Sequence, residues 1–160
     1  MASTVLSLLD ARALAQFHAK GLWRAETIYA VAAGHAARNP ERSALRDRFR
    51  ALSWGQMVAA ADALAGDLAA RGVKAGQRVV FWLPDRIESI VTMLACSRAG
   101  FVCCPSPHRN HTVGEVQAMV ERMRAAAFIY QPGFGADARA PGRANAIEAA
   151  IADIGCVRHI

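Results

Sequence analysis

The sequence has few cysteines and no long apolar segment, and both absences limit the class of protein. Four cysteines in 160 residues are too sparse for a disulfide-stabilised scaffold. The apolar stretches are short and interrupted by Arg, Asp or Gly, far below the roughly 20 residues that a membrane-spanning helix needs. An apolar fraction of 54% is too high for a disordered chain. We therefore expect one globular domain of ordinary size with its own hydrophobic core.

Lysine is also scarce, although the net charge is +6. Only Lys20 and Lys74 are lysines among the 19 basic residues, and the rest are arginines spread along the chain. The densest group lies between Arg42 and Arg50. A nucleic-acid footprint is expected to be clustered and interleaved with aromatic side chains. We therefore predict no nucleic-acid partner.

The N-terminus lacks the features of a secretory signal. No basic residue precedes the apolar stretch in residues 1–9, and Asp10 follows that stretch at once. A secretory signal begins with positive charge and ends at a small-residue cleavage site. Reduced cysteines are typical of the cytosol, so we predict a cytoplasmic protein without a membrane span.

The order of apolar stretches and turn residues predicts an α/β fold with a parallel βαβ sheet flanked by helices. Residues up to Pro40 favour helix, and residues 43–52 favour a short hairpin around a basic turn. After that we expect helices starting at Ser53, Asp85, Thr112 and Ala144, alternating with strands over residues 78–83, 101–104, 126–130 and 156–160. Strands that are apolar on both faces belong inside a parallel sheet. We place an N-terminal helical arm at residues 1–40 and an α/β subdomain at residues 41–160.

Three pairs of polar residues predict where helices begin. Each places a Ser, Thr or Asp three residues before a Gln or Glu, as in a capping box. The pairs are Ser53 with Gln56, Asp85 with Glu88, and Thr112 with Glu115. In the second helix, helical spacing predicts a buried face made of Ile87, Ile90, Val91, Leu94 and Ala95.

The ligand-loop candidates are His108, Arg109 and His111. They lie between a predicted strand and a predicted helix N-terminus, where ligands sit in parallel sheets. Arg109 and the helix N-terminus both favour an anion. A metal is not expected, because the two histidines have no third ligand nearby. An ordinary rigid turn is the alternative.

Other patterns are weaker or incomplete. Gly133-x-Gly135-x-x-Ala138 matches a loose dinucleotide fingerprint, but Pro141-Gly142 interrupts the helix that should follow. A flexible loop is the favoured interpretation. The cysteines show no C-x-x-C spacing and are expected to be free core residues. No complete catalytic constellation and no P-loop is present, so no catalytic residue is assigned.

Several segments together resemble the N-terminal part of adenylate-forming enzymes of the acyl-CoA synthetase type. They are residues 21–28 (GLWRAETI), 39–47 (NPERSALRD), 52–54 (LSW) and 72–79 (GVKAGQRV). Gln77 replaces the usual Asp of the last segment. The resemblance continues through Pro84-Asp85, Leu94-Ala95, Ala99-Gly100 and the Pro105 loop followed by Glu115. Each segment is degenerate, while their order and spacing are specific.

The resemblance implies a reaction and the fold of the N-terminal subdomain of these synthetases. Family members bind ATP with Mg²⁺ and a carboxylic acid, form an acyl-adenylate and pyrophosphate, and then usually transfer the acyl group to coenzyme A. The Gly21-Leu22-Trp23 opening looks most like the branch that uses aryl, alicyclic or medium-chain acids.

The family's catalytic elements do not occur in these residues. They include the Ser/Thr/Gly-rich phosphate loop, the adenine segment, the ribose-binding Asp and the C-terminal domain with its catalytic Lys, all expected beyond Ile160. We therefore expect an N-terminal fragment of an acid–CoA ligase, arising from truncation, a split gene or deliberate shortening. It is expected to be inactive and without a bound cofactor when alone. Its expected partners are the rest of the synthetase or further copies of itself, through exposed sheet and helix faces.

Two alternatives remain. One is a non-catalytic binding module that reuses the fold and docks with a separate chain, and the other is a small dinucleotide-binding domain.

Overall fold

The computed structural model describes residues 10–137, 146–154 and 158–159. Its helices are α1 (Ala11–Ala19), α2 (Ile28–Arg38), α3 (Trp54–Ala70), α4 (Ile87–Ala99), α5 (Val113–Met123) and α6 (Ala146–Ile151). Its strands are β1 (Ser43–Arg46), β2 (Ala51–Ser53), β3 (Arg78–Trp82), β4 (Val102–Pro105), β5 (Ala127–Tyr130) and β6 (Arg158–His159). Residues 1–9, Ala138 and Cys156, on which some sequence expectations rest, lie outside the described residues.

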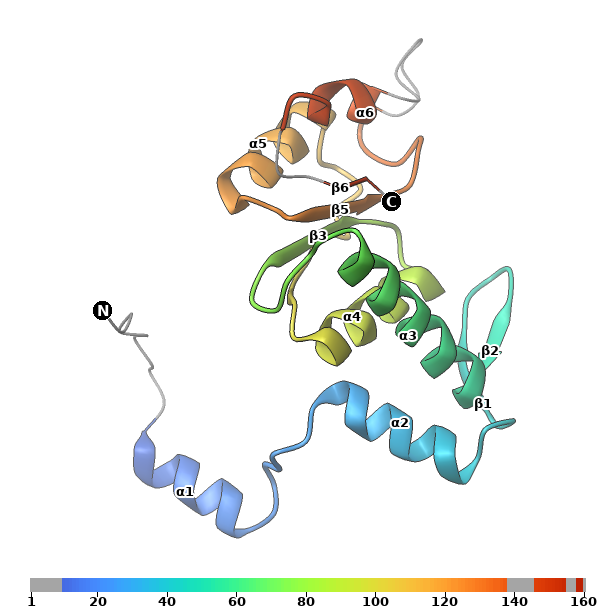
Figure 1. Cartoon of the computed structure of the whole chain (residues 1–160), viewed down its shortest axis with the longest axis vertical. Coiled ribbons are helices and arrows are strands. Elements are labelled where there is room, and N and C mark those ends of the chain that lie inside the picture. Colours follow the sequence, from blue (N-terminus) through green and yellow to red (C-terminus); the bar gives the residue numbers. More distant parts are fainter. Residues whose placement is uncertain (1–9, 138–145, 155–157, 160) are drawn as a thin grey trace.

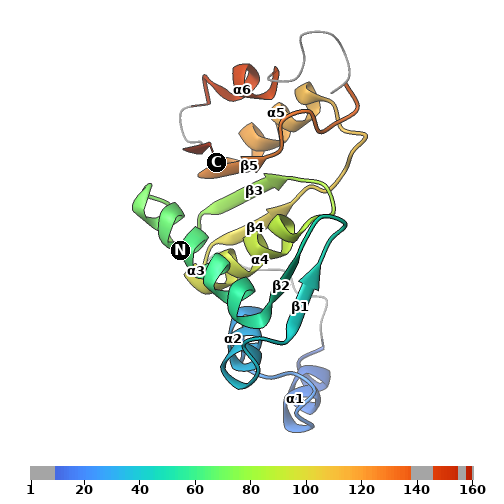
Figure 2. The ribbon, with the colours of Figure 1, turned by 90° about the vertical axis from the view of Figure 1, so that its right-hand side faces the viewer.

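The predicted α/β fold is confirmed. Strands β4, β3, β5 and β6 form one sheet in that order, and every neighbouring pair is parallel. Strands β1 and β2 pair antiparallel as the predicted hairpin. Helices α5 and α6 lie on one side of the sheet, and α3 and α4 lie on the other (Figure 1). The hairpin lies beside α3 and α4 (Figure 2).

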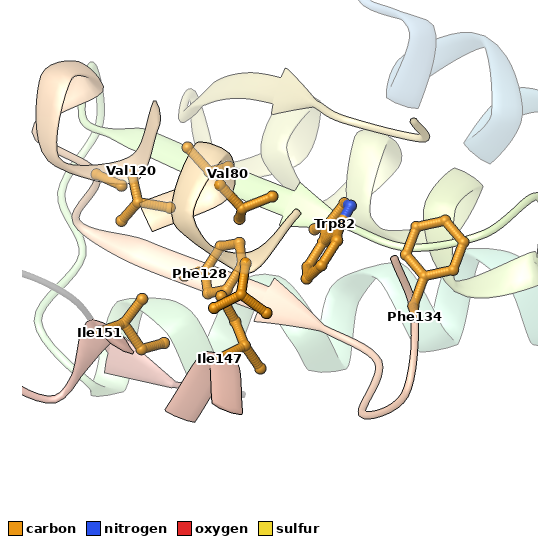
Figure 3. Packing of buried hydrophobic residues seen from close by; sticks show 10 residues of the cluster. Val80, Trp82, Val120, Phe128, Phe134, Ile147 and Ile151 are labelled. Carbon is orange, nitrogen blue, oxygen red and sulfur yellow. The ribbon is translucent and has the colours of Figure 1, made fainter. Parts of the chain in front are cut away.

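Each face of the sheet has its own apolar core. One cluster joins Val80, Trp82 and Phe128 to α5 and α6 (Figure 3). The other joins Val79, Phe81 and Ile129 to residues of α3 and α4 such as Leu68 and Cys96. Alternating residues of the same strands enter opposite clusters, because successive side chains of a strand point to opposite faces. Burial on both faces explains why these strands are continuously apolar.

Helix α2 packs against α3 and α4, whereas α1 has no buried residue. Ala32 of α2 is buried in one cluster with Met57, Ala61 and Leu94. In Figure 1, α1 lies at the end of the molecule farthest from α5 and α6. The division of the chain near residue 40 stays a prediction.

Two of the three predicted capping boxes are present. Both hydrogen bonds of the box are made at Ser53 with Gln56 and at Thr112 with Glu115. The Asp85 box is wrong, because α4 has Arg86 at its N-cap position and no side-chain cap from that residue. The backbone N–H of Ile87 instead donates to Asp47 Oδ2 at 3.4 Å. The cap is thus supplied by the β1–β2 hairpin, 40 residues earlier in the chain.

The predicted buried face of α4 is wrong at one position. Ile87, Val91, Leu94 and Ala95 are buried, but Ile90 is 38% exposed. Thr92 and Cys96 are buried in addition. Thr92 can be buried because its hydroxyl donates to the carbonyl oxygen of Glu88 at 2.7 Å.

Candidate functional site

The strand order places a crevice at the carboxyl ends of β3 and β5. The chain passes from β3 to β4 on one side and then crosses to β5 on the other side of β3. Such a switch point is where open parallel sheets bind ligands. A cavity of about 270 Å³ lies there, with walls from Leu83, Arg86 and Glu88 after β3 and from Tyr130, Gln131 and Pro132 after β5.

Arg86 connects three separate parts of the chain at this crevice. One guanidinium nitrogen donates to Gln131 Oε1 at 3.1 Å. Its Nε lies 3.6 Å from Glu88 Oε2 and 3.9 Å from Asp47 Oδ2. The guanidinium also stacks over the Phe49 ring, with its central carbon 4.7 Å from the ring centroid. Arg86 therefore joins the hairpin, the start of α4 and the loop after β5.

Asp47 fixes the hairpin turn and the start of α4 together. Its Oδ1 accepts from the backbone N–H groups of Phe49 at 2.8 Å and of Arg50 at 2.9 Å. These backbone hydrogen bonds, with that from Ile87 and the charge of Arg86, hold the pKa of Asp47 below its ordinary value. The ionised carboxylate is the form that accepts these bonds.

Glu88 is shared between two arginines. Its Oε1 forms an ion pair with Arg50, while its Oε2 faces Arg86 Nε. Oε2 of Glu88 and Nε of Arg86 are both buried atoms without a hydrogen-bond partner among the described residues. The distance of 3.6 Å between them gives a charge contact that is too long for a good hydrogen bond.

Tyr130 closes the other side of the crevice. Its hydroxyl donates to Glu148 Oε1 at 2.8 Å. Burial, followed by the hydrogen bond to Glu148 and the charge of that carboxylate, raises the pKa of Tyr130 to about 12. The phenol therefore stays protonated at neutral pH and holds α6 against the end of β5.

The structure brings His108 and His111 together, with ring centroids 4.9 Å apart. Their backbone carbonyls have structural roles. His108 O accepts from the indole Nε1 of Trp82 at 3.1 Å, and His111 O accepts from the N–H of Ala136 at 2.9 Å. Arg109 is exposed.

The start of α5 beside these histidines already carries acidic partners. The N–H of Val113 donates to Asp137 Oδ1 at 3.3 Å, and Glu115 Oε2 accepts from the N–H of Thr112 at 2.8 Å. Two carboxylates of this chain thus already accept hydrogen bonds from backbone N–H groups that a bound anion would otherwise use. Anion binding by His108, Arg109 and His111 stays a prediction.

Of the two glycines of the loose dinucleotide fingerprint, Gly135 is used for packing, whereas Gly133 has nothing within 4 Å of an added Cβ. Gly135 has φ +126°, and a Cβ there would lie 2.6 Å from Cζ2 and Cη2 of Trp82. The next described helix, α6, begins only at Ala146, whereas the fingerprint needs a turn directly into a helix. A larger residue at 135 would disturb the Trp82 packing with or without a nucleotide.

The described residues do not fit ATP with Mg²⁺. No group of three His, Cys, Asp or Glu side chains in residues 10–137 and 146–154 could hold a metal ion. The sequence has no glycine-rich loop ending in lysine. Its two lysines, Lys20 and Lys74, are both exposed. We derive no phosphate chemistry from these residues. Within the same described residues, no helix is long and apolar enough to cross a membrane.

A family model described as AMP-binding enzyme matches residues 33–158. The chain belongs to the AMP-binding enzyme family. It is 30% identical over 131 residues to a salicyl-AMP ligase/salicyl-S-ArCP synthetase of Mycobacterium tuberculosis, a match that covers 74% of this chain and 23% of the relative. It is 29% identical over 116 residues to a 2-hydroxy-7-methoxy-5-methyl-1-naphthoate–CoA ligase of Streptomyces carzinostaticus, covering 72% of this chain and 20% of that ligase.

Solved structures of adenylate-forming ligases share the fold. A coronafacic acid ligase variant from Pectobacterium brasiliense superimposes with a TM-score of 0.70 at 17% identity, covering 84% of this chain and 25% of that one. The o-succinylbenzoate CoA synthetase of Bacillus subtilis, solved with its acyl-adenylate intermediate, gives a TM-score of 0.65 at 18% identity, covering 84% of this chain and 31% of that one. The chain therefore spans at most about a third of the length of these AMP-binding relatives.

The sequence did not predict the contacts of Arg86. Asp47 and Gln131 lie 39 and 45 positions away from Arg86, and no local pattern in the sequence connects them. The sheet order, which puts β5 directly beside β3, brings Gln131 to Arg86. The contact of the hairpin with the start of α4 brings Asp47 there.

Proposed function

We propose that this chain is the N-terminal α/β subdomain of an ATP-dependent acid–CoA ligase, which converts a carboxylic acid to an acyl-adenylate and then to a thioester. The family match over residues 33–158 carries this proposal. The names of the relatives support the substrate class, because they include a salicyl-AMP ligase and a naphthoate–CoA ligase. ATP and coenzyme A are the proposed co-substrates of the whole enzyme, with Mg²⁺ as the metal, in the cytoplasm.

The proposed role of this segment is structural. The sheet and the Arg86 contacts join the hairpin, α4 and β5 in one α/β layer, while the described residues hold no phosphate-binding loop and no metal cluster. Catalysis would therefore depend on residues outside these 160, and the partner of this chain would be the remainder of a synthetase. Residues 1–40 would form an arm ahead of the α/β subdomain.

The test is an assay of pyrophosphate release by the purified chain with ATP, Mg²⁺ and a panel of aryl and medium-chain acids. We expect no release above the level without acid, while a full-length ligase under the same conditions is active. Pyrophosphate release that requires both the acid and this chain would contradict the structural role and would favour an independent adenylating activity.

A further inference from the structure

A second cavity, of about 330 Å³, lies between the hairpin, α3, α4 and β5. Its apolar walls come from four different elements: Leu52, Ala60, Leu64, Ile87, Val91 and Ile129. This volume is at the lower end of those that hold small molecules in proteins. A hydrocarbon chain or a single aromatic ring fits such a space, and burying it there would be favourable.

The polar groups at this cavity are Arg50 and Glu88, together with the buried Thr92. The hydroxyl hydrogen of Thr92 is already donated to the carbonyl oxygen of Glu88. The side chains of Arg50 and Glu88 are 49% and 43% exposed, so they lie where the cavity meets solvent. A ligand would therefore place its apolar part among the aliphatic side chains and its polar group beside this ion pair.

Arg50 is the cation at the opening of this cavity, and Glu88 is the carboxylate that pairs with it. Glu88 also lies near Arg86. Arg86 has a second carboxylate, Asp47, at 3.9 Å, and Asp47 also accepts from three backbone N–H groups. Glu88 is therefore the carboxylate that a ligand anion would replace on Arg50.

Glu88 can move from Arg50 to Arg86, which already lies near its other carboxylate oxygen. Its Oε2 and Arg86 Nε are buried, have no hydrogen-bond partner and lie 3.6 Å apart. A small movement of the carboxylate toward Arg86 would satisfy both atoms, since buried polar atoms without partners are costly. A ligand carboxylate would then replace Glu88 on Arg50, and the number of charge-assisted hydrogen bonds would increase.

We propose that this cavity binds an apolar monocarboxylate, with its hydrocarbon part between α3 and α4 and its carboxylate on Arg50. The site involves no ATP and lies within this chain alone, so it is independent of the proposed adenylation. It would give the subdomain its own acid-binding site on the α3/α4 side of the sheet.

The test is a titration of the full 160-residue chain with hexanoate and benzoate, followed by NMR of the Leu, Ile and Val methyl groups. We expect saturable shifts centred on Leu52, Leu64, Val91 and Ile129. Hexanol and hexylamine have the same chain without the carboxylate, and we expect each to bind at least about tenfold more weakly, since one charge-assisted bond is worth about that factor. Hexylamine binding as tightly as hexanoate would overturn the proposal.

Three variants, one of them a control, test where the ligand binds. Arg50→Gln is expected to weaken hexanoate binding about tenfold, while Arg48→Gln, a matched change on the same hairpin outside the cavity, leaves it within about twofold. Ala60→Leu narrows the cavity and is expected to reduce the affinity, with the melting temperature checked for folding. Equal affinity of wild type and Arg50→Gln would overturn the proposal. Intermolecular NOEs from hexanoate to methyl groups outside the cavity would also overturn the proposal, and this measurement needs no variant.

Discussion

The Cα of Gly135 lies directly against the indole of Trp82, on the α5/α6 side of the sheet. A Cβ at position 135 would stand 2.6 Å from two indole carbons and 3.1 Å from His111 O. The same indole packs against Phe134 with ring centroids 5.5 Å apart (Figure 3) and donates to His108 O. Trp82 thus joins the end of β3 to the loops after β4 and β5.

Gly135→Ala is expected to destabilise the fold by about 3 kcal/mol, because it adds a steric clash to a backbone conformation that L residues rarely adopt. Gly133→Ala is the matched control. Gly133 also has a positive φ, +73°, but nothing lies within 4 Å of an added Cβ, so we expect a cost of about 1 kcal/mol. Urea unfolding measures both. Equal losses would contradict the close contact with Trp82.

Asp47 is expected to make stability depend on acid pH. Its folded-state pKa is lowered from the ordinary 3.8 by hydrogen bonds from the backbone of Phe49, Arg50 and Ile87. A lowered carboxylate pKa contributes stability that is present above the unfolded-state value and is lost as the pH falls through the folded-state value. The free energy of unfolding should therefore fall as the pH drops below about 3.8.

Asp47→Asn tests this dependence by urea unfolding between pH 6 and pH 3. The variant should be less stable than wild type at pH 6. The difference should shrink as the pH falls below 3.8, because the carboxylate of the unfolded wild-type chain takes up a proton before the folded one does. Asp85→Asn, at an exposed position before α4, is the control. A difference for Asp47→Asn that stays constant over this range would show that its charge has no role.

The regular part of the fold follows from local sequence patterns, whereas the site depends on contacts between distant residues. Strands apolar on both faces predicted a parallel sheet, and Ser53 and Thr112 marked helix starts that the structure has. Asp85 failed as a cap because Asp47, on the hairpin, already accepts the N–H of Ile87. Helical spacing likewise could not predict that Ile90 is exposed while Val91 is buried. The neighbouring elements in the fold determine which side of a helix is covered.

Tyr130 is expected to titrate at unusually high pH. Burial contributes most to its pKa of about 12, and Glu148 contributes the rest. Glu148→Gln removes the carboxylate charge, so the pKa of Tyr130 should fall but remain above the ordinary 10.0, because the burial is unchanged. The measurement is ultraviolet absorbance of the phenolate in a Tyr29→Phe background, which leaves Tyr130 as the sole tyrosine. An unchanged titration in Glu148→Gln would contradict the contribution of the carboxylate charge.

Cys103 is expected to be alkylated before Cys96 and Cys104. The thiol of Cys96 hydrogen-bonds to Cys103 and lowers its pKa, while the same bond and burial raise the pKa of Cys96. Burial, together with the nearby Cys103, raises the pKa of Cys104. Because the thiolate is the reactive form, iodoacetamide followed by peptide mass spectrometry should find Cys103 modified first among these three.

Two variants separate the hydrogen bond from simple access to solvent. Cys96→Ser keeps a donor beside Cys103 and should preserve its reactivity, whereas Cys96→Ala removes the donor and should slow alkylation of Cys103. Both remove the same thiol, so a change in core packing alone would affect them in the same direction. If Cys103 reacts at one rate in both variants, accessibility and not the hydrogen bond controls its reactivity, because only the donor differs between them.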